Sequence, residues 1–511
     1  MIFDMNAKQI LIALGMCSIS FSVLAQNREA DILRYSRADL GGTARTQAIG
    51  GAQTALGGDI GSLSSNPAGL GFFRRSDFSF SPTLTDIRNN TSYLGNQYSN
   101  DKSALNFANM GVVWARSTPQ ADEGKKSEGW LSYAFGLGYN RTNTYNSNFS
   151  FGGNNKLSSF TYFLADQANI YGINSDNSGN ASDNTLGGQA YNAALINSQK
   201  NGNQTTYQPG TFPSNSSPAG QSGYNYQAGR TDDVNISFGT NYGNQFYLGF
   251  GANLSTLRYS YAFNFLETGI NNVETPTINV HGLNYTENFD AAGTGISAKA
   301  GLIYRPDASI RLGAYLQTPT WYHITEAVNN SMVSSTDNTG APLYTPASSN
   351  GSLASYDMKT PWKYNFGGSF FFRTFGFISA DVELVDYKSA SFHSSDASSV
   401  SINKNIQSVY RSAVNYRLGA EVKAGIFSLR GGYALYGNPY SATTLLSSAT
   451  TSYTGGLGLR TGNFYADIAV INTQFNSPYT AYPIAASSPP SPMVTINSNR
   501  TDFVLTLGSR F

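Results

Sequence analysis

The stretch Leu40–Phe73 reads LGGTARTQAIGGAQTALGGDIGSLSSNPAGLGFF and has no strand pattern of its own. It is rich in glycine and alanine and nearly uncharged, whereas the rest of the chain reads as strands. Within it, Thr43–Leu56 predicts a short helix, although Gly50 and Gly51 each weaken a helix by ~1 kcal/mol relative to alanine. Pro67 fits neither a helix interior nor a central strand. We therefore expect this stretch, called the plug below, to lie inside a β-barrel.

The composition favours a membrane protein that crosses the bilayer with strands. Charged residues make up 12% of the chain, about half the ~25% typical of globular proteins. The sequence has 33 Tyr, 31 Phe and 52 Gly, and its mean hydropathy is −0.28. No run of ~18 or more apolar residues occurs beyond the N-terminus, which excludes helical spans. The net charge of +1 supplies no basic field for nucleic acid.

Residues 1–25 are predicted to be a secretory signal peptide. Lys8 supplies the charged start, Ile10–Leu24 the apolar segment, and Ala25 a small residue before a mature start near Gln26. Cys17 lies within this segment and is not preceded by a small residue, so lipidation is not expected. The mature chain would then contain no cysteine and could form neither a disulfide nor a thiolate metal site.

We expect no cofactor and no metal. The three histidines have no metal-ligand spacing and are expected to be polar strand or loop residues; they are His281, His323 and His393.

From Asp77 onward, apolar and polar residues alternate in about fourteen segments, an even number as in bacterial single-chain barrels. The expected strands are 77–85, 103–116, 130–151, 232–241, 245–266, 283–304, 309–328, 355–373, 376–392, 410–425, 427–438, 450–461, 464–475 and 494–511. The chain is accordingly divided into the signal peptide (1–25), a periplasmic lead and plug (26–76), and an outer-membrane barrel (77–511) with an external insert at 152–231.

The connections alternate in length, as in outer-membrane barrels with short periplasmic turns and long external loops. Short turns are expected at 242–244, 305–308, 373–376, 424–426 and 460–463, and long loops at 152–231, 267–282, 329–354, 393–409, 439–449 and 476–493. The connection 117–129 departs from this rule because it is longer and charged. In the insert, helical spacing predicts one helix from Leu157, Phe160, Leu164, Ala168 and Tyr171. A weaker pattern at Ala190, Ala194 and Asn197 fits a second helix or a disordered loop equally well.

Strand periodicity assigns the faces of the barrel wall. In 376–392, Ile378, Ala380, Val382 and Leu384 share one face, and Asp381 and Glu383 share the other. Charged residues on the lipid face cost up to ~2–4 kcal/mol, so the charged face must point into the lumen. The predicted lumen charges are Lys299, Arg311, Asp381, Glu383, Arg417, Glu421, Lys423, Arg430 and Asp467. They form either an ion pathway or, as we favour, a paired network that braces the plug through Arg45 and Asp59.

The chain ends Phe503-Val504-Leu505-Thr506-Leu507-Gly508-Ser509-Arg510-Phe511. Alternate apolar residues leading to a terminal aromatic resemble the C-terminal strand that outer-membrane assembly machinery recognises.

The plug resembles the N-terminal hatch of the FadL/TodX family of hydrophobic-compound transporters. The resemblance rests on Gly51-Ala52, Ala55, Asp59 and above all the motif Asn66-Pro67-Ala68-Gly69-Leu70 just before the first strand. It is sharp over about thirty residues, and elsewhere concerns the fourteen strands and the helical insert after strand three.

The resemblance implies a monomeric fourteen-stranded barrel closed by a hatch. Hydrophobic ligands such as long-chain fatty acids or aromatic compounds would bind near the external loops, enter the barrel, and leave sideways at a kink in strand three. Phe160, Phe163, Leu164 and Tyr171 are the candidates for a ligand-capture surface, with helix packing as the alternative. Arg417, Lys423 and Arg430 could bind a carboxylate, although pairing with Glu421 and Asp381 is the simpler interpretation.

The sequence thus predicts a non-enzymatic, hatch-gated passive transporter of small hydrophobic molecules in the outer membrane of a Gram-negative bacterium, in contact with membrane lipids. The alternative is a partner or shuttle subunit of a secretion or envelope assembly complex, which the large polar loops would suit. An enzyme is not expected because no G-x-S-x-G motif is present and no histidine lies near a serine and an acid in a recognisable pattern.

Overall fold

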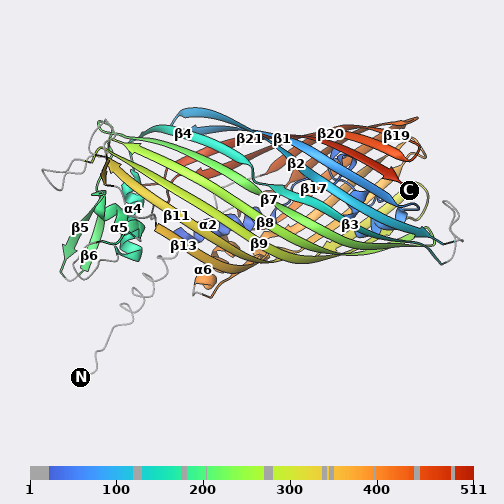
Figure 1. Ribbon diagram of the computed structural model, residues 1–511, viewed down its shortest axis with the longest axis horizontal. Helices are drawn as coiled ribbons and strands as arrows, with labels where there is room; N and C mark the ends of the chain where they lie inside the picture. The colour runs from blue at the N-terminus through green and yellow to red at the C-terminus, as the bar shows by residue number, and fades with distance from the viewer. Residues whose placement is uncertain are drawn as a thin grey trace, which may run out of the picture.

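The computed structural model describes residues 22–118, 129–173, 181–183, 185–202, 204–269, 280–335, 342–344, 350–395, 398–441, 449–484 and 489–511. They form a closed antiparallel β-barrel whose strands are steeply tilted (Figure 1). The last strand pairs with the first, from Asp77↔Arg510 to Ser92↔Thr495, which closes the wall. The predicted fold class is confirmed, and the predicted signal peptide lies almost wholly outside the described residues.

The described wall consists of fourteen crossings, each running from one end of the barrel to the other. Four of them are interrupted and therefore carry two strand labels. The first half consists of β1 (Asp77–Tyr93), β2 (Asn96–Ser117), β3 (Trp130–Thr144) with β4 (Ser147–Asn155), β7 (Ala219–Tyr242), β8 (Phe246–Thr268) and β9 (Gly282–Tyr304). The second half consists of β10 (Ile310–Gln317) with β11 (Trp321–Ser335), β13 (Asn350–Lys359) with β14 (Lys363–Phe371), β15 (Gly376–Asp386) with β16 (Ser391–His393), β17 (Ser412–Ala424), β18 (Phe427–Tyr436), β19 (Thr450–Thr461), β20 (Phe464–Thr480) and β21 (Met493–Arg510). The short β12 (Pro342–Tyr344) pairs with β11.

Strands β1 and β2 are longer than the sequence predicted. The expected connection 86–102 does not exist, because both strands continue to a two-residue turn at Leu94-Gly95, where both residues have positive φ. The predicted ends fell where the apolar residues of the outer face stop. Beyond that level the outer face of the hairpin is polar, and the inner face of β1 mixes Ile87 and Tyr93 with Asn89 and Thr91. The alternation used for prediction therefore disappears although the backbone ladder continues.

Two crossings predicted as single strands, 309–328 and 355–373, are interrupted near Pro319 and Pro361. Proline lacks the N–H that the ladder needs, so the chain leaves regular pairing at these points. The other predicted strands agree with the structure to within a few residues, with three exceptions. Strand β7 begins at Ala219, the crossing 130–151 is broken after Thr144, and the crossing 376–392 is broken after Asp386.

The outer surface carries an apolar band that defines the membrane-crossing part of each strand. On β8 the outward side chains Phe246, Phe250 and Leu254 are exposed, whereas the inward Asn253 and Ser255 are buried. This alternation is what a lipid-facing wall with a polar interior requires. No helix in the described part of the chain is long and apolar enough to span a bilayer.

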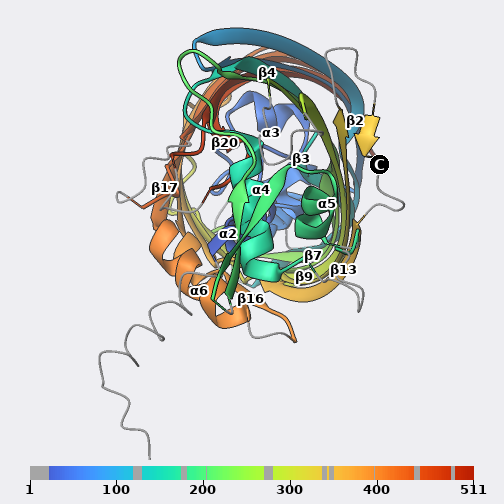
Figure 2. The ribbon, with the colours of Figure 1, turned by 90° about the vertical axis from the view of Figure 1, so that its left-hand side faces the viewer.

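The barrel has two unlike ends. The turn end carries short connections such as 243–245 and 425–426, with the longer 118–129 as the predicted exception, and the lid end carries the other long ones. Across the lid end lie α4 (Phe160–Tyr171), α5 (Leu186–Asn192) and the hairpin of β5 (Ile196–Asn201) and β6 (Gln204–Pro209) (Figures 1 and 2). The insert is therefore 156–218 rather than 152–231. The first predicted helix is present as α4, which starts after Leu157. Of the weaker second pattern only Ala190 lies in a helix, α5, whereas Asn197 lies in β5.

Two further helices pack at this end of the barrel, and the sequence prediction missed both. Helix α2 (Ser22–Ser36) occupies most of the segment predicted as a periplasmic lead, and its Ile32 and Tyr35 are buried against inward wall residues such as Tyr259. Helix α6 (Ser398–Val409) packs against α2. Along the chain it comes after the short turn η3 (Tyr387–Ser389) and also contacts it. The lead prediction was wrong because the apolar residues of α2 are few and find their partners only inside the barrel.

Candidate functional site

The plug lies inside the barrel, where Figure 2 shows its short helix α3 (Ala44–Ala48) within the ring of strands. Thr43 caps α3 by accepting a hydrogen bond from Thr46 N, and Gly50 and Gly51 end it with φ of 65° and 75°. Two 3₁₀ helices follow, η1 (Ile60–Leu63) and η2 (Pro67–Phe72). Of the helix predicted over Thr43–Leu56, only about the first third is helical, because the two glycines favour the left-handed conformation that ends it.

A belt of inward-facing glycines surrounds the plug. A Cβ at any of them would approach a plug atom more closely than 3.0 Å; they are Gly111, Gly136, Gly138, Gly239, Gly249, Gly301, Gly313, Gly367, Gly419, Gly432 and Gly456. They come from ten strands, so the plug rests on bare wall backbone around most of the circumference. Sequence reasoning missed this belt, although the 52 glycines in the chain were a signal for close backbone approach.

The motif Asn66-Pro67-Ala68-Gly69 joins the plug to this belt. Asn66 caps η2 by accepting from Ala68 N at 3.1 Å, and its amide group donates to the carbonyl oxygens of Thr54 (2.7 Å) and Leu302 (3.3 Å). All four motif residues are buried, and Pro67 and Ala68 lie directly against Gly249 of the wall. One side chain thus connects two plug segments and β9, which explains why asparagine suits this position.

A buried ion network links the plug to the wall. Arg45 Nε lies 3.0 Å from Glu421 Oε2, the same oxygen that Arg430 Nε approaches at 2.7 Å, and Arg430 also reaches Asp467 Oδ1 at 2.6 Å. The side chains of Glu421, Arg430 and Asp467 are each only 1% exposed. Asp59 is a weaker partner, 3.8 Å from Arg45, and mainly caps η1 by accepting from Gly61 N at 2.8 Å.

The other predicted lumen charges divide between the plug and the space beside it. Asp381 accepts from the plug amide of Thr54 at 2.9 Å, and Arg311 donates to the Leu56 carbonyl. Arg417 and Glu383 instead pair with each other at 3.1 Å and line a cavity. Lys299 donates to the Ser64 carbonyl of the plug and lines the same cavity. Lys423 is 46% exposed on the rim and lies 3.5 Å from Glu421.

A cavity of about 460 Å³ lies between the plug and α2. Its size is within the range of small-molecule sites. Polar and apolar groups line it in similar measure: Arg34, Tyr35, Lys299, Lys363, Glu383, Arg417 and Arg500 on the one hand, and aromatic rings such as Tyr145, Phe149, Tyr322 and Tyr479 on the other. This lumen cavity is the candidate binding site, and its floor is formed by plug residues such as Gly51 and Ser64.

The wall is interrupted beside the lumen cavity. The ladder between β2 and β3 ends at Asn109↔Asn140. Strand β3 then stops, and after Tyr145-Asn146 strand β4 continues the pairing with β7. Among the described residues β4 has no backbone pairing with β2. The cavity lining includes 142–147, so the cavity reaches this break.

Side chains rather than backbone bridge the break. Asn89 donates to Ser147 Oγ at 2.8 Å and to the Asn148 carbonyl at 2.7 Å, and Asn100 Oδ1 accepts from Ser150 N at 2.8 Å. The hairpin of β1 and β2 thus overlaps β4 on its outer side, as Figure 2 shows at the top of the ring. We call the seam between them the lateral slot. Each of these hydrogen bonds contributes ~0.5–1.5 kcal/mol net, and they take the place of a regular backbone ladder along this seam.

The lid end is closed by an aromatic cluster built around α4. Phe160 and Leu164 are 1% and 0% exposed and pack among Phe265, Tyr285 and Tyr482. Both residues therefore form the core of the lid and not a ligand-capture surface. For these two residues the helix-packing alternative of the sequence analysis holds. Of the other two capture candidates, Phe163 is partly buried against the same cluster and Tyr171 is 44% exposed. The cluster shares Phe149 and Tyr479 with the lining of the lumen cavity.

A buried carboxylate fastens the lid to the barrel rim. Glu267, beyond the apolar band of β8, accepts hydrogen bonds from Ser159 Oγ, from Phe160 N at 2.9 Å and from Gln221 Nε2 at 2.7 Å. Gln221 also donates to Tyr482 Oη at 2.7 Å, which joins a second loop to the network. Burial raises the pKa of Glu267 to about 7, because a desolvated carboxylate prefers its neutral form even with these donors.

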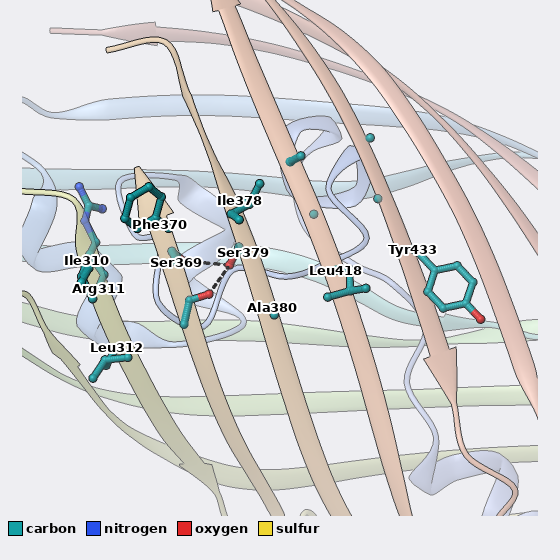
Figure 3. Close-up of a pocket in the computed structure, with 15 residues that line it drawn as sticks. Ile310, Arg311, Leu312, Ser369, Phe370, Ile378, Ser379, Ala380, Leu418 and Tyr433 are labelled. Carbon is teal, nitrogen blue, oxygen red and sulfur yellow. Dashed lines mark hydrogen bonds between the residues drawn. The ribbon is translucent and has the colours of Figure 1, made fainter. Parts of the chain in front are cut away.

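A second hollow lies on the lipid-facing surface, away from the lumen (Figure 3). It measures about 670 Å³ and is rimmed by Leu312, Phe370, Ile378, Leu418 and Tyr433. Small outward residues form its base, among them Gly368, Ala380 and Gly431. Directly inside, Gly419 and Gly432 contact Ile49 and Gly50 of the plug, so this part of the wall is only one backbone thick.

No group of three or more potential metal ligands occurs among the described residues. His323, one of the three histidines, is exposed and lies 2.8 Å from Asp357.

By sequence, no protein-family profile and no curated protein matches this chain. By structure, it is similar to a Pseudomonas aeruginosa FadL homologue, with a TM-score of 0.57, 12% identity, and coverage of 93% of this chain and 100% of the other. It is also similar to the Ralstonia pickettii toluene transporter TbuX (TM-score 0.50, 17% identity, 92% and 99% coverage) and to the P. putida toluene transporter TodX (TM-score 0.50, 14% identity, 93% and 99% coverage). At these identities the likeness concerns the fold. The resemblance stated from the plug motif is thus confirmed at the level of the fold.

Proposed function

We propose that this protein is a passive channel for a small hydrophobic molecule in the outer membrane of a Gram-negative bacterium. The lid end faces outward and the turn end faces the periplasm. The ligand passes the lid, rests in the lumen cavity and leaves sideways through the lateral slot. The observation that carries this proposal is the continuity of the lumen cavity with the interrupted wall between β2 and β4.

The plug favours a sideways exit over an axial one. An axial pore requires the plug to leave its glycine belt and the buried network of Arg45, Glu421 and Arg430. Breaking a buried ion pair by removing one partner costs ~3–5 kcal/mol, and here several contacts would be lost together. Opening the slot leaves the plug in place and separates the β1–β2 hairpin from β4. This breaks the hydrogen bonds across the seam, the Lys102 contact to β7 and the packing of Tyr93 on Phe151 at 4.8 Å.

The slot also suits an apolar ligand. Each Å² of apolar surface kept out of water is worth ~25 cal/mol, so a ligand that moves directly from the lumen into lipid avoids a cost that an aqueous exit would impose. The mixed lining of the lumen cavity suits a ligand with an apolar body and a polar group. Toluene transport by two proteins of the same fold is consistent with an aromatic body. Long-chain fatty acids are the other candidate class.

The slot can be tested with an engineered disulfide between Asn100→Cys and Ser150→Cys, whose side chains already meet across the seam. We expect the oxidised variant to lose uptake of a radiolabelled aromatic hydrocarbon or fatty acid in whole cells, and reduction to restore it. The matched control is Asn90→Cys with Ser99→Cys, an exposed pair directly opposite within the same hairpin that does not cross the slot. Unchanged uptake in the oxidised slot variant would refute the lateral exit.

Mass spectrometry of the protein purified in mild detergent tests the transport role itself. A lipid or aromatic compound retained in the barrel supports transport. An empty lumen together with a stoichiometric protein partner would favour the alternative, a subunit of a secretion or envelope assembly complex.

A further inference from the structure

The outward face of β7 and β8 carries an arginine pair just beyond the lid-end edge of the apolar band. The band ends with the opposed residues Val234 and Leu254, both exposed. The next outward positions are Asp232 and Thr256, and the following ones are Arg230 and Arg258. In a membrane-embedded barrel, this level is where lipid headgroups meet the protein.

Arg230 and Arg258 lie directly opposite each other in the antiparallel ladder. Opposed residues on one face have Cβ atoms ~4.5–5.5 Å apart, and like charges in this arrangement are destabilising. The side chain of Arg258 is exposed and makes no hydrogen bond or ion pair with the residues that the structure describes. The repulsion between the two guanidinium groups is thus offset only in part within the protein.

The nearby acids do not neutralise this site. Asp232 is shared by two cations, with Arg230 Nε at 2.7 Å and Arg141 Nε at 2.9 Å. On β9 the residue opposite Arg258 is Ala292. Asp290 is two positions before Ala292 on the same face and therefore lies diagonally from Arg258. Three arginines against two carboxylates leave a net charge of +1 on this small outward patch.

A fourth cation lies next to the patch at the lateral slot. Lys102 of β2 reaches across the broken crossing to β7, where it donates to the Gln227 carbonyl at 2.6 Å and lies 3.6 Å from the Tyr226 ring centroid. The basic residues therefore extend from β8 to the mouth of the slot. We call Arg141, Arg230, Arg258 and Lys102 the basic rim.

We propose that the basic rim binds the phosphate of an outer-leaflet lipid headgroup, of the kind that lipid A carries. A guanidinium group matches a phosphate in a bidentate geometry, and a phosphate placed between Arg230 and Arg258 would convert their repulsion into two charge-assisted contacts. The acyl chains of that lipid would lie along the apolar outward residues of β7 and β8, beginning with Val234 and Leu254. A lipid held there stands beside the slot, where a departing ligand enters the leaflet.

This inference uses the membrane placement and orientation proposed above but not the transport activity, so its test involves no transport. Native mass spectrometry of the detergent-solubilised full chain measures retention of added lipid A. The variants are Arg230→Gln, Arg258→Gln and the double variant. The matched control is Arg373→Gln, which removes an exposed arginine from the short turn at the opposite end of the barrel.

We expect each rim substitution to weaken lipid A retention about fivefold and the double variant about thirtyfold, because a basic residue near an anionic surface contributes by roughly that factor. Arg373→Gln should retain lipid A like the unmodified protein, and diacylglycerol, a lipid without phosphate, should be held equally by all variants. Equal retention of lipid A by the double variant, or an equal loss in Arg373→Gln, would overturn the proposal. Displacement of lipid A by an equimolar amount of inorganic phosphate would also overturn it, because the site would then bind a soluble anion.

Thermal unfolding in lipid-free detergent separates a loss of binding from a loss of folding. Arg258→Gln relieves the like-charge contact, so its unfolding temperature should equal or exceed that of the unmodified protein, and added lipid A should raise it less. A variant that unfolds earlier without lipid would contradict the assigned repulsion.

Discussion

Glu421 is the residue whose removal should most directly release the plug. Its side chain is 1% exposed and joins Arg45 of the plug to Arg430 of the wall through one carboxylate oxygen. Glu421→Ala leaves Arg45 with only the 3.8 Å contact to Asp59, whereas Arg430 keeps Asp467 at 2.6 Å. Removing one partner of a buried pair costs ~3–5 kcal/mol, and most of this cost falls on the plug side.

This free energy sets the size of the expected effect. A loss of ~3–5 kcal/mol corresponds to a rise of roughly 10²- to 4 × 10³-fold in the population of plug-released molecules, at ~1.4 kcal/mol per tenfold. Hydrogen exchange of the α3 amides should accelerate by up to that factor, while the amides of β8 and β9 keep their rates. Planar-bilayer recordings should show more frequent openings, because the released plug no longer fills the lumen.

Lys423→Ala is the matched control, since this lysine contacts the same carboxylate at 3.5 Å but is 46% exposed. A partly exposed pair is worth ~1 kcal/mol or less, so its exchange and conductance should stay near those of the unmodified protein. Asp59→Ala should have an intermediate effect through the lost cap of η1. If Glu421→Ala leaves both α3 exchange and conductance unchanged, the network does not brace the plug.

Three further predictions concern the belt and the lid. Gly249→Ala places a Cβ against the backbone of Ala68 and should destabilise the plug by ~1–3 kcal/mol, seen as faster proteolysis of residues 40–73; Gly431→Ala, whose Cβ meets open space outside, should not. Because the folded-state pKa of Glu267 is raised from 4.5 to about 7, its contribution to lid stability is fully present below pH 4.5 and is lost as pH rises through 7. The protection factors of the lid amides, which already exclude the base-catalysed rise of intrinsic exchange, should therefore fall between pH 4.5 and 7, and in Glu267→Gln this fall should vanish. Phe160→Ala should cost ~3–5 kcal/mol and loosen α4 in the same assay without altering exchange at the turn end.

Much of the wall was predictable because each strand carries its own two-residue period. The faces assigned in 376–392 agree with the structure, where Ile378 and Leu384 are exposed to lipid while Asp381 and Glu383 are buried. The rule that charge avoids lipid is local, so it works without knowing the neighbours of a strand. The same rule failed at 86–102, where the outward residues of β1 become polar and apolar residues such as Ile87 and Tyr93 lie on its inner face.

The candidate site was less predictable because its parts meet only in three dimensions. Glu383 and Arg417 looked like plug braces from their lumen face, yet their height in the barrel places them in the cavity wall. Phe160 and Leu164 had the spacing of a helix face, but a spacing cannot tell whether that face meets ligand or the ends of β8 and β9. The segment 26–39 was too polar to predict a buried helix by itself.

The sequence by itself determined the barrel, its inward and outward faces, and a plug with an Asn-Pro-Ala joint, because these depend on local period, backbone restriction and the cost of charge in lipid. Only the tertiary structure decided the glycine belt, the lumen cavity and the lateral slot. Each of these arises where segments far apart in the chain approach closely, as Asn66 does to β9 and Asn100 to β4. A glycine in a strand sequence does not show which segment will pack against it. Only the folded structure shows that plug atoms would lie within 3.0 Å of a Cβ at these positions.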